Sequence, residues 1–305
     1  MSASTPVGIN APLTRRSRSA RTNWGAALFF LGPTTIAFIL FSYFPLGKAI
    51  YMSLFDWDWV KPPGVFTGIQ NYINSLRSVS FRMDLSNTVI LFLFALALGF
   101  WVPILQALFL DQIRGITHRV AKYLYLLPMA IPGVGVYLIW KWIWYPDVGL
   151  ANGLLHLLGL PPLLWLGDPH LVKLTLRLPY LLGGGMNVMI YLAAIQGVSP
   201  ELYEAAEIDG AGAWQRLTRI TLPQIWHMVS ILFILTLTQA LLAFDDVFVL
   251  TAGGPGNASA TIVYGLYTVA FKQQMMGQAA AWAVLVLLVT LIVTGIQLRM
   301  RREEQ

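Results

Sequence analysis

The chain has 305 residues, of which 57% are hydrophobic and only 11% are charged, and its formal net charge is +6. A soluble domain would be about one quarter charged, so the composition excludes an ordinary soluble domain and makes the lipid bilayer the solvent. The absence of cysteine excludes disulfides, thiolate catalysis and cysteine-ligated metal centres.

The first 23 residues form a basic tail ahead of the first apolar segment. The tail contains Arg15, Arg16, Arg18 and Arg21 among Ser, Thr and Pro, and it leads into a full-length apolar stretch. It has neither the short apolar core nor the small-residue cleavage site of a signal peptide, so residues 1–23 are predicted to remain as a cytoplasmic tail.

Six apolar segments follow, each close to the ~20 residues that a helix needs to cross the hydrocarbon core. Lipid offers the backbone no hydrogen bonds, so the segments are predicted to be helices. The predicted fold class is an all-α polytopic membrane protein with a permease domain over residues 24–298 and a short tail at 299–305. The predicted spans cover residues 24–44, 86–110, 123–144, 171–195, 223–244 and 277–298.

Basic residues are distributed unevenly between the two sides that these spans define. Twelve of the 20 Lys and Arg residues lie in the two tails and in the loops after the second and fourth spans. This bias predicts that both termini are cytoplasmic, and it accounts for the basic charge without a nucleic acid partner. The loop at 196–222 is then cytoplasmic, and the segment between the last two spans is outside.

The cytoplasmic segment 201–223, "ELYEAAEIDGAGAWQRLTRITLP", holds four of the 14 acidic residues between two apolar runs. Ser199 and Pro200 predict the start of a helix, and Asp209-Gly210 predicts a left-handed turn that ends it. A second short helix is predicted at 213–220. The result is an elbow on the cytoplasmic face that is suited to docking a partner.

This segment resembles the inner-membrane permease subunits of binding-protein-dependent ABC importers. Their signature is Glu-Ala-Ala, three residues, Gly, nine residues, Ile, one residue and Leu-Pro, and every spacing matches. The resemblance implies that these residues couple the chain to a separate ATPase: Glu204, Ala205, Ala206, Gly210, Ile220, Leu222 and Pro223.

Three further stretches resemble the carbohydrate-uptake branch of that family, which includes maltose and glycerol-phosphate permeases. They are "FTGIQNY" at 66–72, "PELYEAAEIDGA" at 200–211 and "LTAGGPGNAS" at 250–259. The resemblance implies a bacterial or archaeal plasma membrane, a second and non-identical permease subunit, two ATPase subunits and an extracytoplasmic solute-binding protein. It implies no enzymatic activity, with ATP and Mg²⁺ bound by the partner ATPase; the sequence has no G-x-x-x-x-G-K-[ST] phosphate loop.

Polar residues inside spans are the first places to look for a solute path. In the fourth span Asn187 and Tyr191 are one turn apart, and in the fifth Thr236 and Gln239 share a face. The alternative role for each is hydrogen bonding or packing between helices. The glycine run at 183–185 and the Pro-Gly pair at 132–133 are predicted to mark close helix packing and bends rather than a binding loop.

The outer loop after the fifth span is predicted to face the solute-binding protein. Its candidate docking residues are Asp245, Asp246, Gly253, Gly254 and Pro255, although a Gly-Pro sequence is often only a turn.

Two alternatives remain beside this interpretation. A self-contained secondary transporter or channel would have similar composition, but such folds usually carry internal repeats, and it would leave the elbow unexplained. Asp56-Trp57-Asp58 has the form of a metal-binding pair, but two carboxylates in an outer loop are more often solvated. The sequence predicts no catalytic residue and no metal site, and several classes of sugar or sugar-like solute fit it.

Overall fold

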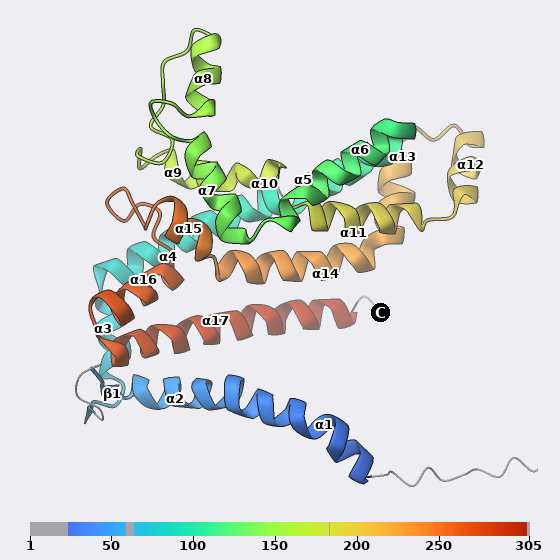
Figure 1. Ribbon diagram of the computed structural model, residues 1–305. Helices are drawn as coiled ribbons and strands as arrows, with labels where there is room; N and C mark the ends of the chain where they lie inside the picture. Colours follow the sequence, from blue (N-terminus) through green and yellow to red (C-terminus); the bar gives the residue numbers. More distant parts are fainter. Residues whose placement is uncertain (1–23, 59–63, 183, 304–305) are drawn as a thin grey trace, which may run out of the picture. The chain divides into compact units, whose positions relative to one another are not determined.

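The computed structural model describes residues 24–58, 64–182 and 184–303, and most of these residues are helical (Figure 1). This confirms the all-α prediction. The chain divides into two compact units, with the boundary after Lys48. Among the described residues, four helices are long and apolar enough to cross a membrane, and two bent helix pairs raise the number to six if each pair is one span.

The first unit contains most of one continuous apolar helix. It is built from α1 (Trp24–Phe38), a π-helical turn (Ile39–Tyr43) and α2 (Phe44–Ser53), whose last residues belong to the second unit. The part suited to crossing a membrane is Leu28–Ser53, so this helix ends nine residues beyond the predicted boundary at 44.

The second unit begins with a small structure that connects the end of α2 with the start of the last helix. Strands β1 (Phe55–Asp56) and β2 (Val65–Phe66) pair antiparallel, and α3 (Gln70–Arg77) follows. The Asn71 amide donates to the carbonyl oxygens of Ser53 and Phe55 at 2.9 and 2.8 Å. The Gly277 amide donates to the Trp57 carbonyl at 3.0 Å, which fixes the start of the last helix here.

The second span is one helix of 34 residues, Val79–Gln112, that starts seven residues before the predicted boundary. It consists of α4 (Val79–Phe94), a π-helical turn (Ala95–Phe100) and α5 (Trp101–Gln112). Ser78 caps its first turn by accepting a hydrogen bond from the Phe81 amide. The first turns of α4 carry the charged residues Arg82 and Asp84, so a prediction from hydropathy alone placed the start of the helix too late.

The third and fourth spans are bent, which confirms the bends predicted at the Pro132-Gly133 pair and at the glycine run 183–185. In the third, α6 (Gly115–Leu126) and a 3₁₀ turn (Leu127–Ala130) meet α7 (Gly133–Ile143) at 105°. Pro132 precedes α7 and has no N–H to continue a helix. In the fourth, α9 (Val172–Arg177) and α10 (Pro179–Leu182) meet α11 (Gly185–Gln196) at 43°. Helix α8 (Leu150–Leu157) lies between these spans.

The fifth span begins earlier than predicted. After α12 (Pro200–Ile208), the helix runs without a break from α13 (Ala213–Arg216) through a π-helical turn (Leu217–Thr221) into α14 (Leu222–Leu241). The predicted separate helix at 213–220 is therefore the base of the fifth span. Pro223 can sit inside it because it falls in the first turn after the π-helical register shift, where its missing N–H costs little.

The last part of the chain contains α15 (Asp245–Leu250), α16 (Ile262–Tyr267) with a π-helical turn (Thr268–Lys272), and α17 (Met276–Glu303). The helix Ile262–Lys272 is apolar but too short to cross a membrane. Helices α5, α11 and α14 lie side by side (Figure 1) and share the largest hydrophobic core of the described residues, which includes Phe100, Tyr191 and Val229.

Candidate functional site

Helix α12 carries the predicted coupling segment and ends in the predicted left-handed turn. Gly210 has a φ of +73°. The Gly210 amide donates to the Glu207 carbonyl at 3.1 Å, and the Ala211 amide donates to the Ala206 carbonyl at 2.8 Å. These bonds satisfy the last carbonyl groups of the helix. At the other end Pro200 occupies the first helical position as predicted, but the Ser199 side chain makes no capping hydrogen bond.

The surface of α12 is open, and part of it is apolar. Glu204 and Ala205 are exposed, and the Ile208 side chain is 87% exposed. Trp214, just beyond the turn, is 73% exposed. The helix extends beyond the ends of α11 and α14 (Figure 1). Ile208 and Trp214 are thus two large apolar side chains left uncovered on and beside α12.

A half-buried contact joins α12 to the fifth span. The Tyr203 hydroxyl lies 3.0 Å from the Thr221 hydroxyl, and Thr221 is buried at the base of α14. The ion pair between Arg216 and Glu207 is 3.8 Å long and largely exposed, so it adds little. Of the remaining predicted coupling residues, Ile220 and Leu222 are half-buried and Pro223 is exposed. They belong to the base of the span rather than to the elbow.

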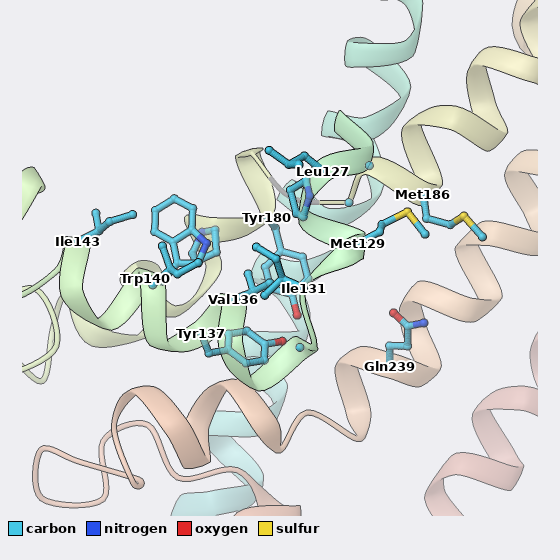
Figure 2. Close-up of a pocket in the computed structure, with 16 residues that line it drawn as sticks. Leu127, Met129, Ile131, Val136, Tyr137, Trp140, Ile143, Tyr180, Met186 and Gln239 are labelled. Carbon is cyan, nitrogen blue, oxygen red and sulfur yellow. The ribbon is translucent and has the colours of Figure 1, made fainter. Parts of the chain in front are cut away.

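A cavity of about 580 Å³ lies where the third and fourth spans are bent. Its volume is in the usual range for a small-molecule site, about 300–1,000 Å³. The lining is mostly apolar, and its polar side chains come from Tyr137 on α7, Tyr180 on α10 and Gln239 on α14, with the Trp140 ring beside them (Figure 2). The hydroxyls of Tyr137 and Tyr180 lie close together and interact.

The glycines of the fourth span allow this arrangement. Gly184 has a φ of +79°, and a Cβ on Gly185 would lie 1.8 Å from the Tyr125 carbonyl oxygen, so α11 meets α6 here backbone against backbone. This confirms the predicted close packing. Gly184, Gly185 and Gly133 also line the cavity, which the sequence interpretation did not anticipate. Gly183 lies outside the described residues.

Of the four predicted path residues, the structure brings only Gln239 to the cavity. Tyr191 is 1% exposed and belongs to the core of α5, α11 and α14. Thr236 is half-buried and faces Gly99, and Asn187 is half-buried on α11. Sequence reasoning missed Tyr137, Tyr180 and Trp140. The Pro132-Gly133 break before α7 was the available signal, because a bend exposes the side chains that flank it.

A buried ion pair lies behind the cavity wall. Arg177 Nη1 donates to Asp246 Oδ2 at 2.8 Å, and the two side chains are 1% and 3% exposed. The same nitrogen donates to the Tyr180 hydroxyl at 3.2 Å, while Asp246 Oδ1 accepts from the Val247 amide at 2.9 Å. Asp246 is therefore part of the interior, and its predicted role as an accessible docking residue does not agree with its position. Asp245 is exposed.

The outer turn is tied to the second span. The Asn87 amide donates to the carbonyls of Asn257 and Ala260 at 2.8 and 3.1 Å, and the Ser259 hydroxyl donates to the Gly254 carbonyl at 2.6 Å. Gly253 is buried, with a φ of +81°, and a Cβ there would lie 2.6 Å from the Tyr264 ring. Gly254 and Pro255 are half-buried. The accessible part of the predicted docking surface is therefore Asp245, together with the half-buried Gly254 and Pro255, which form the rim of the turn.

A metal-binding role for Asp56 and Asp58 gains no support from the structure. Within the described ranges, no group of three His, Asp or Glu side chains is placed to hold a metal ion.

Comparison with known proteins identifies the class to which this architecture belongs. Residues 85–303 match the family described as binding-protein-dependent transport system inner membrane component. The matched region includes the bent spans, the cavity and α12. The chain belongs to this family.

Particular members resemble the chain over most of its length. The diacetylchitobiose uptake system permease protein NgcF of Streptomyces coelicolor is 35% identical over 281 residues, covering 87% of this chain and 79% of that protein. The crystal structure of a bacterial ABC transporter involved in the import of the acidic polysaccharide alginate matches with a TM-score of 0.80 and 27% identity, covering 92% of this chain and 96% of that one. A bacterial alginate ABC transporter in complex with an alginate pentasaccharide-bound periplasmic protein also matches, with a TM-score of 0.80, 26% identity and coverage of 92% and 94%.

Proposed function

We propose that this chain is the transmembrane permease subunit of an ATP-driven ABC importer for a carbohydrate. The observation that carries the proposal is α12, an exposed helix that projects from the ends of the spans and holds the Glu204-Ala205-Ala206 and Gly210 signature. Family membership and the carbohydrate substrates named for the similar proteins support it.

In this proposal, α12 docks on a separate ATPase subunit that binds ATP and Mg²⁺. The exposed Ile208 and Trp214 would supply apolar contact area, and Glu204 would meet basic groups of the partner. The Tyr203–Thr221 contact connects α12 to α14, so movement of the docked helix would reach the fifth span at its base. A helix and the turn that fixes its angle can transmit such a displacement as a rigid element.

The cavity at the bends of the third and fourth spans is the proposed solute path on this subunit. Saccharides present hydroxyl groups and apolar ring faces, and the cavity presents two phenol hydroxyls, an amide and an indole ring. Aromatic rings provide apolar contact area together with specific geometry. A second permease subunit, non-identical to this one, would complete the path from the other side.

The remaining assembly follows from the family's organisation. Two ATPase subunits would lie on the cytoplasmic side, together with both termini of this chain. An extracytoplasmic solute-binding protein would dock near Asp245 and the rim of the outer turn, and one similar structure contains such a periplasmic protein. The chain would function in a bacterial or archaeal plasma membrane.

Reconstitution tests this function. Vesicles containing this chain, the partner permease and the ATPase subunits are expected to take up carbohydrate only with ATP and the solute-loaded binding protein, which should also stimulate ATP hydrolysis. The competing class, a self-contained secondary transporter or channel, predicts that this chain alone moves solute down an ion or solute gradient. Full transport by the chain alone would overturn the proposal.

A further inference from the structure

The cavity has no charged side chain in its wall. Its described lining consists of aliphatic, aromatic, Met, Pro and Gly residues together with Gln239, and none of these is Lys, Arg, Asp, Glu or His. A ligand that carries a charge would find no opposite charge in contact with it on this subunit.

The arginine in contact with the lining residue Tyr180 is already paired with a carboxylate. Arg177 lies behind Tyr180, and its guanidinium is paired with Asp246 at 2.8 Å. Its Nε and Nη2 atoms are fully buried, with no hydrogen-bond partner among the described residues, so they do not face the cavity space. A buried ion pair of this kind contributes almost no net charge to its surroundings, because the two opposite charges lie only a few ångström apart.

The other charges that the structure describes near the cavity are one acid and one base, so together they add no net positive charge. Asp245 is exposed on α15 and lies within electrostatic range of the Tyr137 hydroxyl. Lys141 is exposed on α7 next to Trp140, and its amine donates to the Val249 carbonyl at 3.0 Å, a neutral partner that does not cancel its charge. Asp245 and Lys141 therefore oppose each other, and an acidic ligand in the cavity would find no cationic side chain among the described lining residues to pair with it.

Hydrogen-bonding groups, in contrast, are available in the cavity. Figure 2 shows the Tyr137 and Tyr180 hydroxyls together on one wall, with the Gln239 amide on another and the Trp140 ring to the side. Hydroxyls and amides can each donate and accept hydrogen bonds, which matches the hydroxyl groups of a neutral sugar.

We propose that the cavity of this subunit accepts uncharged saccharides and disfavours acidic ones, with Gln239 as a residue that sets this preference. The proposal rests on the proposed function and narrows its substrate class. It distinguishes this chain from a similar transporter that imports the acidic polysaccharide alginate.

Equilibrium binding to the assembled transporter tests the preference without the solute-binding protein, whose own selectivity would mask it. The probes are radiolabelled neutral di- to pentasaccharides and hexuronate oligosaccharides of the same lengths. We expect at least one neutral saccharide to bind, and its hexuronate counterpart to bind at least about tenfold more weakly, which corresponds to about 1.4 kcal/mol.

A matched pair of variants tests whether the preference for neutral saccharides arises in the cavity. Gln239 is exposed to the cavity, so a longer side chain fits there. Gln239→Lys is expected to raise binding of hexuronates relative to neutral saccharides by about tenfold, because a cation at contact distance is worth at least ~1 kcal/mol even in high dielectric. Gln239→Met, which has similar size and no charge, is expected to weaken both classes alike and leave their ratio unchanged.

Each result that would contradict this proposal has a different meaning. Wild-type binding of hexuronates that equals or exceeds binding of neutral saccharides would overturn this proposal and leave a carbohydrate importer intact. An unchanged ratio in Gln239→Lys would overturn the role of Gln239. Binding of neither class, together with failure of carbohydrate uptake in the complete system, would overturn this proposal and the proposed function together.

Discussion

Gly210 ends α12 in a backbone conformation that a β-branched residue adopts only with strain. Its φ is +73°, and a Cβ placed there meets nothing within 4 Å, so a substitution would act through the backbone alone. Gly210→Val should cost roughly 1–3 kcal/mol or change the angle between α12 and α14. We expect uptake and binding-protein-stimulated ATP hydrolysis to fall by about tenfold or more, since 1.4 kcal/mol is a factor of ten.

Asparagine provides the matched control, because it tolerates the left-handed region better than other side chains. Gly210→Asn should retain most of both activities. The measurements are solute uptake and ATPase rate in the same reconstituted vesicles. Normal assembly of Gly210→Val with both rates unchanged would show that this turn does not transmit the coupling motion.

Asp245 and Asp246 are adjacent in the sequence but opposite in environment. Asp246→Ala would leave the buried Arg177 without its partner, and breaking such a pair costs about 3–5 kcal/mol. We expect loss of assembled complex in membranes, measured by co-purification. Asp245→Ala removes an exposed carboxylate, so it should leave assembly intact while weakening the response to the solute-binding protein.

The double variant Arg177→Met with Asp246→Leu tests whether the unpaired buried charge causes the loss of assembly in Asp246→Ala. Replacing both charges by apolar side chains of similar volume is often neutral for stability, so this variant should recover the assembly that Asp246→Ala loses. If Asp246→Ala assembles as well as the wild type, the ion pair is not needed for the fold. If the double variant fails as completely as Asp246→Ala, the carboxylate has a further role.

At the scale of elements, local sequence predicts where helices lie but not how they bend. The apolar runs located the four long apolar helices and the two bent pairs of the described residues, and Asp209-Gly210 predicted the turn after α12. Pro132 marked a break, yet the 105° angle depends on what α6 and α7 pack against. The early start of the fifth span was missed because π-helical turns such as Leu217–Thr221 have no clear local signature.

The contacts between segments that lie far apart along the chain could not be predicted from the sequence. Arg177 and Asp246 are 69 residues apart, and only the packing of α9 against α15 brings them together. Asp245 and Asp246 look equivalent in the sequence, because which face of α15 is buried depends on its neighbours. Tyr137 and Tyr180 line one cavity for the same reason, each at a different bend.

The contact between α6 and α11 makes a prediction about the bent spans. A Cβ on Gly185 would lie 1.8 Å from the Tyr125 carbonyl oxygen, so Gly185→Ala must push the two helices apart beside the cavity. Overpacking of this kind typically costs 1–3 kcal/mol. We expect a lower melting temperature of the purified complex and reduced uptake.

Gly133→Ala is the matched control, because it changes a glycine that also lines the cavity and has nothing within 4 Å of the added Cβ. It should leave the melting temperature unchanged within a degree or so. Equal melting temperatures for both variants and the wild type would contradict the tight helix contact at Gly185.

At the scale of the whole second unit, the proposed partner surfaces lie at opposite ends. Figure 1 shows α12 at one end of the helix bundle and the α15–α16 loop at the other, with α14 running between them. Helix α17 starts beside β1 and α3 and runs toward the end where α12 lies (Figure 1). This places the C-terminal end of the chain and α12 on the same side, as the distribution of basic residues predicts.

Site-directed labelling tests this orientation directly, because the chain contains no cysteine that would give a background signal. Gly212 has a φ of −66° with open space around it, and Val148 is 74% exposed between α7 and α8, so cysteine fits at both positions. An impermeant thiol reagent applied to intact cells should label Val148→Cys and leave Gly212→Cys unlabelled. Permeabilised cells should allow both to be labelled, which controls for accessibility. Labelling of Gly212→Cys but not Val148→Cys in intact cells would reverse the orientation and place α12 on the side where no ATPase could reach it.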